Sequence, residues 1–410
     1  MHLKIIEKMR GKFVKILAIN SVPYGSTCNI MIGVAETAIQ SHAYIVATGF
    51  STHPGDFRIK YIKIGGGVDK AVHMYSSILT GFNGCFSHLA TKIFLKEIEK
   101  YYPDIIHLHN LHGWYINLPM LFRFIKKYEI PVVWTLHDCW AFTGQCPHFA
   151  MVKCDKWKTG CYDCPQYREY PAALVDRTKT MWKLKKEWFT EVENMTIVTP
   201  SQWLADLVKQ SFLKDYSVRV IHNGIDLNIF KPTSSSFKER YGITEKHIVL
   251  GVAFGWGKRK GLDVFVELSR RLPPEYQIVL VGTDDSTDKL LPDNIISIHR
   301  TQNQTELAEI YTAADLFINP TREENYPTVN MEAIACGTPI LTFKTGGSPE
   351  ILSDNTGAVV NCDDINAMEE EIIRICETHP YSEESCVERA KLFDMNNMIK
   401  EYINLYKEIL

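Results

Sequence analysis

Short apolar runs alternate with longer helical stretches along this chain, and the alternation occurs twice. Such runs are typical of parallel strands that are buried on both faces, with helices as right-handed crossovers between them. The first series is VKILAIN, AYIVATG, DIIHLHN, PVVWTLHD and MTIVTPS, starting at residues 14, 43, 104, 131 and 195. The second series is HIVLGVAF, QIVLVGT, IISIHR, DLFINP and PILTF, starting at residues 247, 277, 295, 315 and 339. The sequence therefore predicts an α/β fold with two Rossmann-like sheets.

The length of the chain and a turn near its middle indicate where the two sheets separate. A chain of 410 residues is too long for one ordinary core. The segment VIHNGIDLNIFKP (220–232) lies between the two series and contains a turn-forming Asn-Gly pair. We predict an amino-terminal domain over 1–221, a second domain over 222–390 and a final helix over 391–410.

Composition indicates a globular protein, with 45% hydrophobic and 23% charged residues. No apolar run approaches the roughly 20 residues that a membrane-spanning helix needs. The start MHLKIIEKMRGKFVKILAIN has no signal-peptide pattern. We therefore expect a cytosolic protein.

The formal charge of −3 hides an asymmetry between the two halves. Residues 1–230 contain 27 Lys and Arg against 19 Asp and Glu, a balance of +8, and the remainder contains 18 against 29, a balance of −11. A basic amino-terminal half suits peripheral contact with an anionic membrane at its inner face, or a phosphorylated acceptor. No nucleic-acid partner is expected, because the zinc-finger, RNA-binding and long basic patterns are absent.

The segment DLFINPTREENYPTVNME (315–332) places Glu324 and Glu332 eight residues apart across a predicted strand, loop and helix start. Helix N-termini present N–H groups that suit a pyrophosphate, so the backbone of Thr328 and Val329 is a candidate donor-binding site. The two carboxylates would accept hydrogen bonds from sugar and ribose hydroxyls. On spacing alone, a capping residue and a helix-surface charge would be the commoner arrangement.

The next segment, CGTPILTFKTGGSPEIL (336–352), adds a predicted strand and a Gly346-Gly347 turn. Together these segments resemble the retaining glycosyltransferases of family 4, which carry a Glu, seven residues, a second Glu, a strand and a Gly-Gly turn. The resemblance implies the GT-B fold, in which two Rossmann-like domains face a central cleft and the last helix crosses back to the first domain. The 220–232 segment is similar to the hinge of these enzymes.

The resemblance assigns most donor-binding residues to the second domain. Glu324 would hold the transferred sugar during catalysis, and Glu332 would hold the ribose diol. Arg259 and Lys260, at a strand-to-helix junction, suit the diphosphate of the leaving nucleotide, and a solvated surface pair is the alternative. The arginine that the family usually carries just upstream is Phe254 here. Further donor-binding candidates are Tyr326, Arg300 and Thr301, with Gly25 in the phosphate loop of the first domain.

His137 and Asp138 follow a predicted strand, and ligands of open α/β sheets bind at such strand ends. In family 4 a His in a context such as TLHD lies near the transferred sugar, so the resemblance implies a catalytic role for His137 and an acceptor-side role for Asp138. The loop HLHNLHGWYIN (107–117) adds His109 and Asn110 to the acceptor side. A metal fits its histidines less well, because no carboxylate lies at a matching spacing. Family 4 enzymes need no catalytic metal.

A cysteine-rich insert spans residues 139–171. Four thiolates can close a tetrahedral zinc site, and two residues between the last two cysteines is a typical spacing for one. Scattered thiols and a disulfide pair are the alternatives, the latter disfavoured in a reducing cytosol. A comparable insert occurs in a bacterial subgroup of family 4 that builds surface polysaccharides. We predict structural zinc, held by Cys146, Cys154, Cys161 and Cys164.

The segment RTKTMWKLKKEWF (177–189) places Trp182, Trp188 and Phe189 among five basic residues. A basic helix with aromatic residues can lie in a lipid interface, and a half-buried helix with a wet basic face is the alternative. The sequence leaves both interpretations open.

The best interpretation is a retaining glycosyltransferase that moves a sugar from a nucleotide-diphosphate sugar to a glycan acceptor, in cell-surface polysaccharide biosynthesis. The acceptor is expected to be linked to a polyprenyl diphosphate. One alternative is another GT-B sugar-nucleotide enzyme such as an epimerase. The other is a non-catalytic sugar-nucleotide-binding partner of a membrane synthase.

Overall fold

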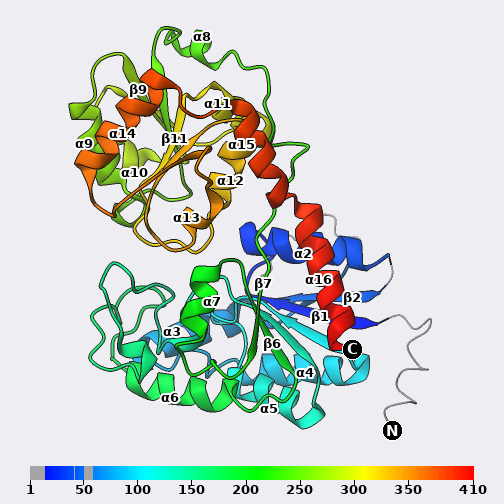
Figure 1. Ribbon diagram of the computed structural model, residues 1–410. Helices are drawn as coiled ribbons and strands as arrows, with labels where there is room; N and C mark the ends of the chain where they lie inside the picture. Colours follow the sequence, from blue (N-terminus) through cyan, green and yellow to red (C-terminus); the bar gives the residue numbers. More distant parts are fainter. Residues whose placement is uncertain (1–13, 41, 50–58) are drawn as a thin grey trace. The chain divides into compact units, whose positions relative to one another are not determined.

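The computed structural model describes residues 14–40, 42–49 and 59–410. Residues 1–13, on which the signal-peptide expectation rests, lie outside the described residues. The chain divides into two compact units (Figure 1). The amino-terminal unit contains the described residues up to Pro200 with Leu204–Ile221 and Ile399–Leu410. The carboxyl-terminal unit contains Ser201–Trp203 and His222–Met398, so it extends eight residues beyond the predicted end at 390.

The amino-terminal unit is built on a seven-stranded parallel sheet. Its strand order is β3-β2-β1-β4-β5-β6-β7. Strands β1 to β3 are added toward one edge of the sheet and strands β4 to β7 toward the other edge, so the order of addition reverses between β1 and β4. In open α/β sheets, ligands bind beyond the carboxyl ends of the strands at such a reversal. The strands are β1 (Lys15–Asn20), β2 (Ala43–Thr48), β3 (Lys60–Lys63), β4 (Ile105–Leu108), β5 (Val132–Thr135), β6 (Met195–Thr199) and β7 (Ser217–Val220).

Helices follow most of these strands, but a long insert separates β5 from the next α-helix. Within residues 136–177, all of which the structure describes, the only helical turns are the short η1 (Trp140–Phe142) and η2 (Lys156–Lys158). The α-helices are α2 (Ser26–Ala38), α3 (Gly67–Thr80), α4 (His88–Tyr101), α5 (Leu118–Tyr128), α6 (Thr178–Phe189) and α7 (Gln202–Val208).

The carboxyl-terminal unit is built on a six-stranded parallel sheet of order β10-β9-β8-β11-β12-β13, which reverses between β8 and β11. Its strands are β8 (His247–Val252), β9 (Tyr276–Val281), β10 (Ile295–Ile298), β11 (Leu316–Asn319), β12 (Ile340–Phe343) and β13 (Gly357–Val360). Its helices are α8 (Phe237–Tyr241), η3 (Lys258–Lys260), α9 (Leu262–Arg271), α10 (Asp285–Asp288), α11 (Gln304–Ala313), α12 (Thr328–Ala335), α13 (Ser348–Ile351), α14 (Ile365–Thr378), α15 (Glu383–Ala390) and η4 (Lys391–Phe393).

Apolar side chains fill two clusters in this unit. One cluster joins the sheet to α9 and α14, and the other joins it to α11, α12 and α15. Strands buried by helices on both sides explain why the sequence shows continuous apolar runs instead of alternation. The predicted Rossmann-like sheets are confirmed in both units.

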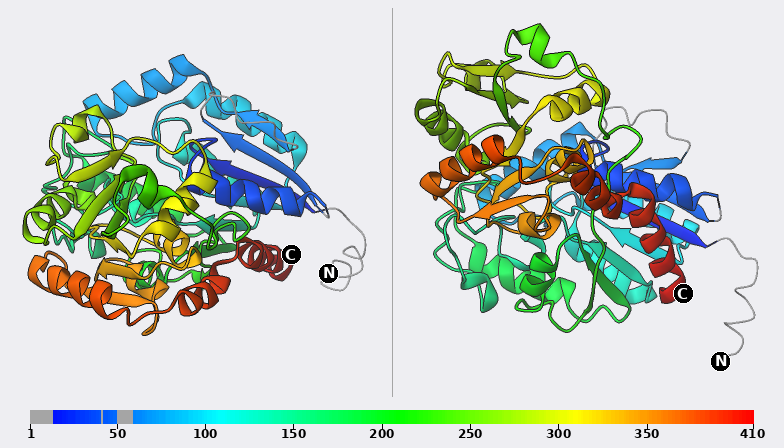
Figure 2. Two further views of the ribbon diagram at one scale, coloured as in Figure 1. Left: turned by 90° about the horizontal axis from the view of Figure 1, so that it is seen from above. Right: turned by 45° about the horizontal axis from the view of Figure 1, so that its top comes forward.

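The last helix, α16 (Met395–Ile409), packs its second half on the sheet of the amino-terminal unit (Figure 2). Tyr402 and Tyr406 are buried there. The Tyr406 hydroxyl lies 2.6 Å from His107 Nδ1 in β4, and the Tyr402 hydroxyl lies 3.0 Å from Thr135 Oγ1 in β5. None of the helices in the described ranges has the length and hydropathy needed to cross a bilayer.

Candidate functional site

In the carboxyl-terminal unit, two of the predicted donor-binding residues contact each other. The ammonium of Lys260, in η3, lies 2.5 Å from Glu324 Oε2 in the loop after β11. The Asn325 amide donates to the other Glu324 oxygen at 3.1 Å. Both charged side chains are about one-fifth exposed, so water reaches them. The pair lies beyond the carboxyl ends of β8 and β11, where the strand order reverses.

The Gly346-Gly347 turn supports the loop that carries Glu324. A Cβ on Gly346, whose φ is +56°, would lie 1.8 Å from the Glu324 carbonyl oxygen. A Cβ on Gly347 would lie 2.5 Å from the Asn325 oxygen, which already accepts from the Gly347 amide at 2.8 Å. The turn therefore needs glycine because another backbone approaches it closely.

Arg322 holds the loop after β11 to η3, and sequence reasoning missed it. Its guanidinium donates to both Asp263 oxygens at 2.7 and 2.9 Å, to Asp363 at 2.6 Å and to the Lys258 carbonyl. Its amide donates to the Arg259 carbonyl at 2.9 Å. Arg322 is only 8% exposed, so it is a structural clamp that fixes the backbone next to Lys260.

The helix predicted from Val329 is α12, which begins one residue earlier at Thr328, so Glu332 lies beyond its first turn and not within it as predicted. No side chain of the described residues caps its first turn, and that turn contains no acidic residue. Glu332 accepts a hydrogen bond of 3.1 Å from the Tyr311 hydroxyl. Burial raises the pKa of the Glu332 carboxyl to about 7, although hydrogen bonds from Tyr311 and Thr328 oppose the rise.

The other donor-side candidates have different surroundings. The ring of Tyr326 is buried and stacks on His222 with 4.8 Å between the ring centroids, so its ring packs within the carboxyl-terminal unit. Arg300 and Thr301 follow β10, an edge strand, which ends two residues earlier than the predicted run. Phe254, after β8, is fully exposed.

In the amino-terminal unit, His109 and His137 share a hydrogen bond of 3.0 Å between Nδ1 and Nε2, and their rings stack. The His107 ring lies 4.1 Å from His109 between centroids. Burial lowers the pKa of His137 to about 4 and of His107 to about 3, and it holds the pKa of His109 well below its usual range. All three rings are therefore neutral at pH 7.

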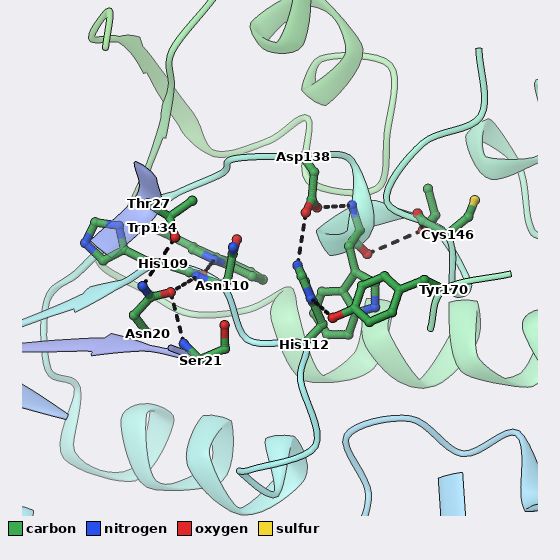
Figure 3. A network of polar contacts seen from close by, with 12 residues as sticks. Asn20, Ser21, Thr27, His109, Asn110, His112, Trp134, Asp138, Cys146 and Tyr170 are labelled. Carbon is green, nitrogen blue, oxygen red and sulfur yellow. Dashed lines mark hydrogen bonds and ion pairs between the residues drawn. The ribbon is translucent and has the colours of Figure 1, made fainter. Parts of the chain in front are cut away.

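Asp138 belongs to a second network, with His112 and Tyr170 (Figure 3). His112 Nε2 lies 3.0 Å from Asp138 Oδ2, and His112 Nδ1 lies 2.9 Å from the Tyr170 hydroxyl. The Trp140 amide donates to Asp138 Oδ1 at 2.8 Å. Burial alone would raise the pKa of Asp138, but His112 and the other partners lower it to about 2. Asp138 is therefore an anion at neutral pH.

Asn20, at the end of β1, joins the loops around the strand reversal (Figure 3). Its Oδ1 accepts from the amides of Ser21 at 2.9 Å and Asn110 at 3.3 Å. Its Nδ2 donates to Thr27 Oγ1 at 3.4 Å, in the first turn of α2. Gly25 precedes α2 with a φ of +82° and has no atom within 4 Å of its Cβ position, so the backbone there is open.

The four predicted zinc ligands, Cys146, Cys154, Cys161 and Cys164, line one cavity in the insert. Their sulfur atoms do not form a closed ligand set as they stand. In the described ranges, only the exposed Asp285, Asp288 and His299 bring three ligand atoms within 4.8 Å of one another.

α6 buries its aromatic residues, so the lipid-interface interpretation of this helix is wrong. Trp182, Trp188 and Phe189 are all less than 10% exposed. Lys185 is also fully buried, and burial lowers its pKa to about 7. Its ammonium donates to the Trp140 carbonyl and lies 3.6 Å from the centre of the Trp140 ring. The sequence indicated Lys185 only as one of five basic residues in this segment.

Two Rossmann-like units in one chain, with a strand reversal in each sheet, define a protein of the GT-B class. Two family models match: "Glycosyltransferase Family 4" over residues 45–229 and "Glycosyl transferases group 1" over residues 234–393. The chain belongs to the family 4 glycosyltransferases, as its motifs indicate, and it uses a nucleotide-sugar donor.

Similar proteins include the putative colanic acid biosynthesis glycosyl transferase WcaC of Escherichia coli (strain K12). It is 25% identical over 320 residues, which are 75% of this chain and 77% of the relative. Among solved structures, sucrose-phosphate synthase from Thermosynechococcus elongatus has a TM-score of 0.71 at 19% identity, covering 97% of this chain and 99% of the other. Anabaena HepE in complex with UDP-glucose has a TM-score of 0.66 at 14% identity, covering 96% and 99%. These two structures support the fold.

Proposed function

We propose that this protein is a retaining glycosyltransferase that moves a sugar from a nucleoside-diphosphate sugar to a glycan acceptor on a polyprenyl diphosphate, in surface-polysaccharide assembly. The observation that carries the proposal is the contact between Lys260 and Glu324 beside the uncapped start of α12. A cation for the leaving group and a carboxylate for the sugar are thereby side by side.

The leaving diphosphate gains negative charge as the glycosidic bond breaks. Lys260 and Arg259 supply positive charge, and the first amides of α12 supply a partial positive charge from the helix dipole. Because these groups are held in place by Arg322 and the Gly-Gly turn, little reorganisation is needed during the reaction. The proposal therefore assigns no metal to the catalytic step.

The two glutamates take different hydroxyls. Glu324 accepts hydrogen bonds from the sugar once its ammonium partner turns to the phosphates. Glu332, deeper in α12, accepts from the ribose diol, and its pKa of about 7 means that ionisation is part of nucleotide binding. The proposal places no second carboxylate across the glycosidic bond as in glycosidases, so the acceptor attacks from the leaving-group face after partial departure.

The amino-terminal unit supplies the acceptor side. Neutral His137, hydrogen-bonded to His109, is the proposed contact for a sugar hydroxyl. Anionic Asp138, fixed by His112 and the Trp140 amide, accepts from an acceptor hydroxyl. Similarity to the colanic acid glycosyl transferase supports a surface-polysaccharide acceptor, and the HepE complex with UDP-glucose supports a UDP-sugar as the first donor to test.

The experiment supplies nucleotide-diphosphate sugars to the purified protein with and without a short-chain polyprenyl-diphosphate sugar. We expect nucleotide release only when both are present, with the anomeric configuration retained in the product by NMR. Release without acceptor would favour the epimerase-like alternative. Donor binding without turnover on any acceptor would favour the non-catalytic partner.

A further inference from the structure

The insert between β5 and α6 lacks the regular elements that stabilise the rest of its unit. Over residues 136–177 it contains two short helical turns, and its apolar contacts centre on Trp157, which lies 5.1 Å from Phe142 and 5.0 Å from Phe149 between ring centroids. Segments of this size rarely bury enough apolar surface to be ordered on their own, and a metal or disulfide cross-link commonly supplies the difference.

The four cysteines of the insert lie around a single cavity beside Trp157. The turn between Cys161 and Cys164 is held from outside by Lys156, whose ammonium donates to the carbonyls of Tyr162 at 3.1 Å and Asp163 at 3.0 Å. The Gly144 amide donates to Cys161 Sγ at 3.1 Å. Burial raises the pKa of the Cys161 thiol to about 11, and the Gly144 amide opposes that rise. A bound zinc ion would stabilise the thiolate, which is the form that binds it.

Gly144 also fixes the other side of the cavity. A Cβ there would lie 2.9 Å from Cys161 Cβ and 2.5 Å from the Thr178 carbonyl at the start of α6. The segment before Cys146 therefore touches both the Cys161 turn and the helix. The four cysteines therefore line a cavity whose walls are already in contact, and the proposed site requires their sulfur atoms to turn toward one another.

Lys185 supplies a second, independent observation. A buried ammonium is costly unless negative charge compensates it. The anion-forming side chains that act on Lys185 are the thiols of Cys161 and Cys146 and the carboxylate of Asp138. Four thiolates around one Zn²⁺ leave about two negative charges, so a zinc tetrathiolate would add to the negative charge that Asp138 already supplies near Lys185.

We infer that Cys146, Cys154, Cys161 and Cys164 bind one structural zinc ion, and that buried Lys185 balances its charge from α6. Because Lys185 bonds the Trp140 carbonyl and the Trp140 amide bonds Asp138, the metal site also braces the Asp138 network. This inference is independent of the proposed transfer, since it is tested on metal content.

The first test measures zinc and iron by mass spectrometry in protein purified without a metal-affinity step and passed through a chelator-washed column. We expect about one zinc per chain, and four fewer reactive thiols in native protein than after strong chelation. Cobalt substitution should give the ligand-field spectrum of a tetrahedral tetrathiolate. Absence of metal with all thiols reactive, a disulfide found under non-reducing conditions, or iron in place of zinc would each overturn the inference.

Substitutions distinguish zinc bound at this site from adventitious metal bound elsewhere. Cys154→Ser and Cys164→Ser should lose most of the zinc, whereas Cys362→Ser, at an exposed cysteine of the other unit, should keep it. Lys185→Met should release zinc to a chelator at least tenfold faster, and Lys186→Met, on the exposed side of the same helix, should not. Equal zinc retention in Cys154→Ser, Cys164→Ser and Cys362→Ser would rule out the tetrathiolate.

Discussion

The carboxylate of Glu324 contacts Lys260 and the Asn325 amide in the free protein. Glu324→Gln keeps the shape and removes the charge that holds the sugar, so we expect transfer to fall about 10²- to 10³-fold. The affinity for the nucleotide sugar, measured by calorimetry, should change little. Lys260 loses its contact with a carboxylate in this variant, so it is available to contact the phosphates. Glu370→Gln, on the exposed side of α14, is the matched control. A loss of affinity as large as the loss of rate would contradict the assignment.

Glu332 gives the donor site a pH dependence of known sign. Its pKa is raised by burial from 4.5 to about 7, so the folded state holds its proton more tightly than the unfolded chain. Ionisation of Glu332 therefore lowers the free energy of unfolding as the pH rises from about 4.5 to 7. Above that range it causes no further loss of stability. If the ribose diol binds the carboxylate, donor affinity should rise between pH 6 and 8.

The measurement is calorimetry with an intact nucleotide sugar, whose diphosphate has no proton to lose in this range. Glu332→Gln should flatten the pH dependence and bind about tenfold more weakly, as expected for a lost charge-assisted hydrogen bond. A wild-type affinity that is constant from pH 6 to 8 would show that Glu332 does not ionise on binding.

Several residues of the site could not be predicted from the sequence, because their partners are distant along the chain. Asn20 bonds Asn110, Arg322 bonds Asp263, and Lys185 bonds Trp140. Each looks like an ordinary polar residue until the fold brings the partner near. By contrast, Glu324 and Glu332 were predictable as a pair because one strand, loop and helix carries both.

At the scale of elements, substitution in the Gly346-Gly347 turn tests whether this turn supports the loop that carries Glu324. Gly346→Ala would place a methyl group 1.8 Å from the Glu324 carbonyl at a φ of +56°, so the loop must move. We expect loss of transfer and a stability cost of about 1–3 kcal/mol. Gly242→Ala is the control, because its φ is +65° and nothing lies within 4 Å. The measurements are the transfer rate and the thermal denaturation midpoint of each variant. Similar transfer rates in Gly346→Ala and Gly242→Ala would show that the loop carrying Glu324 does not depend on the Gly346-Gly347 turn.

The second half of α16 is joined to the amino-terminal sheet by buried hydroxyls. Tyr406→Phe leaves His107 Nδ1 without its 2.6 Å partner, and we expect a loss of about 1–3 kcal/mol in the free energy of unfolding. Tyr102→Phe, at an exposed tyrosine, controls for the substitution itself. Denaturant titration that found the two variants equally stable would exclude a contribution from this contact.

The strands that sequence reasoning missed are β3, β7 and β13, each at the edge of its sheet. Edge strands are short and partly exposed, so KYIK and SVRV carry charges and lack the continuous apolar run on which the prediction relied. The central strands were predictable because helices bury both of their faces.

For the whole molecule, the basic amino-terminal half predicts salt-sensitive binding to anionic membranes. We expect sedimentation with phosphatidylglycerol vesicles at low salt and release at high salt, as the screening length falls from about 8 Å at 0.15 M to about 3 Å at 1 M. Phosphatidylcholine vesicles are the control. Equal binding to both lipids, or binding that salt does not weaken, would disprove an electrostatic attachment.

The insert after β5 adds no strand, and β5 pairs directly with β6 whatever lies between them in sequence. Its length and composition can therefore drift during evolution without changing the register of the sheet. A lineage could exchange the part of this insert that follows Asp138 and acquire a different glycan partner while keeping His137, Asp138 and the donor site. Diversity of surface sugars would then arise from replacement of a single loop instead of the invention of new enzymes.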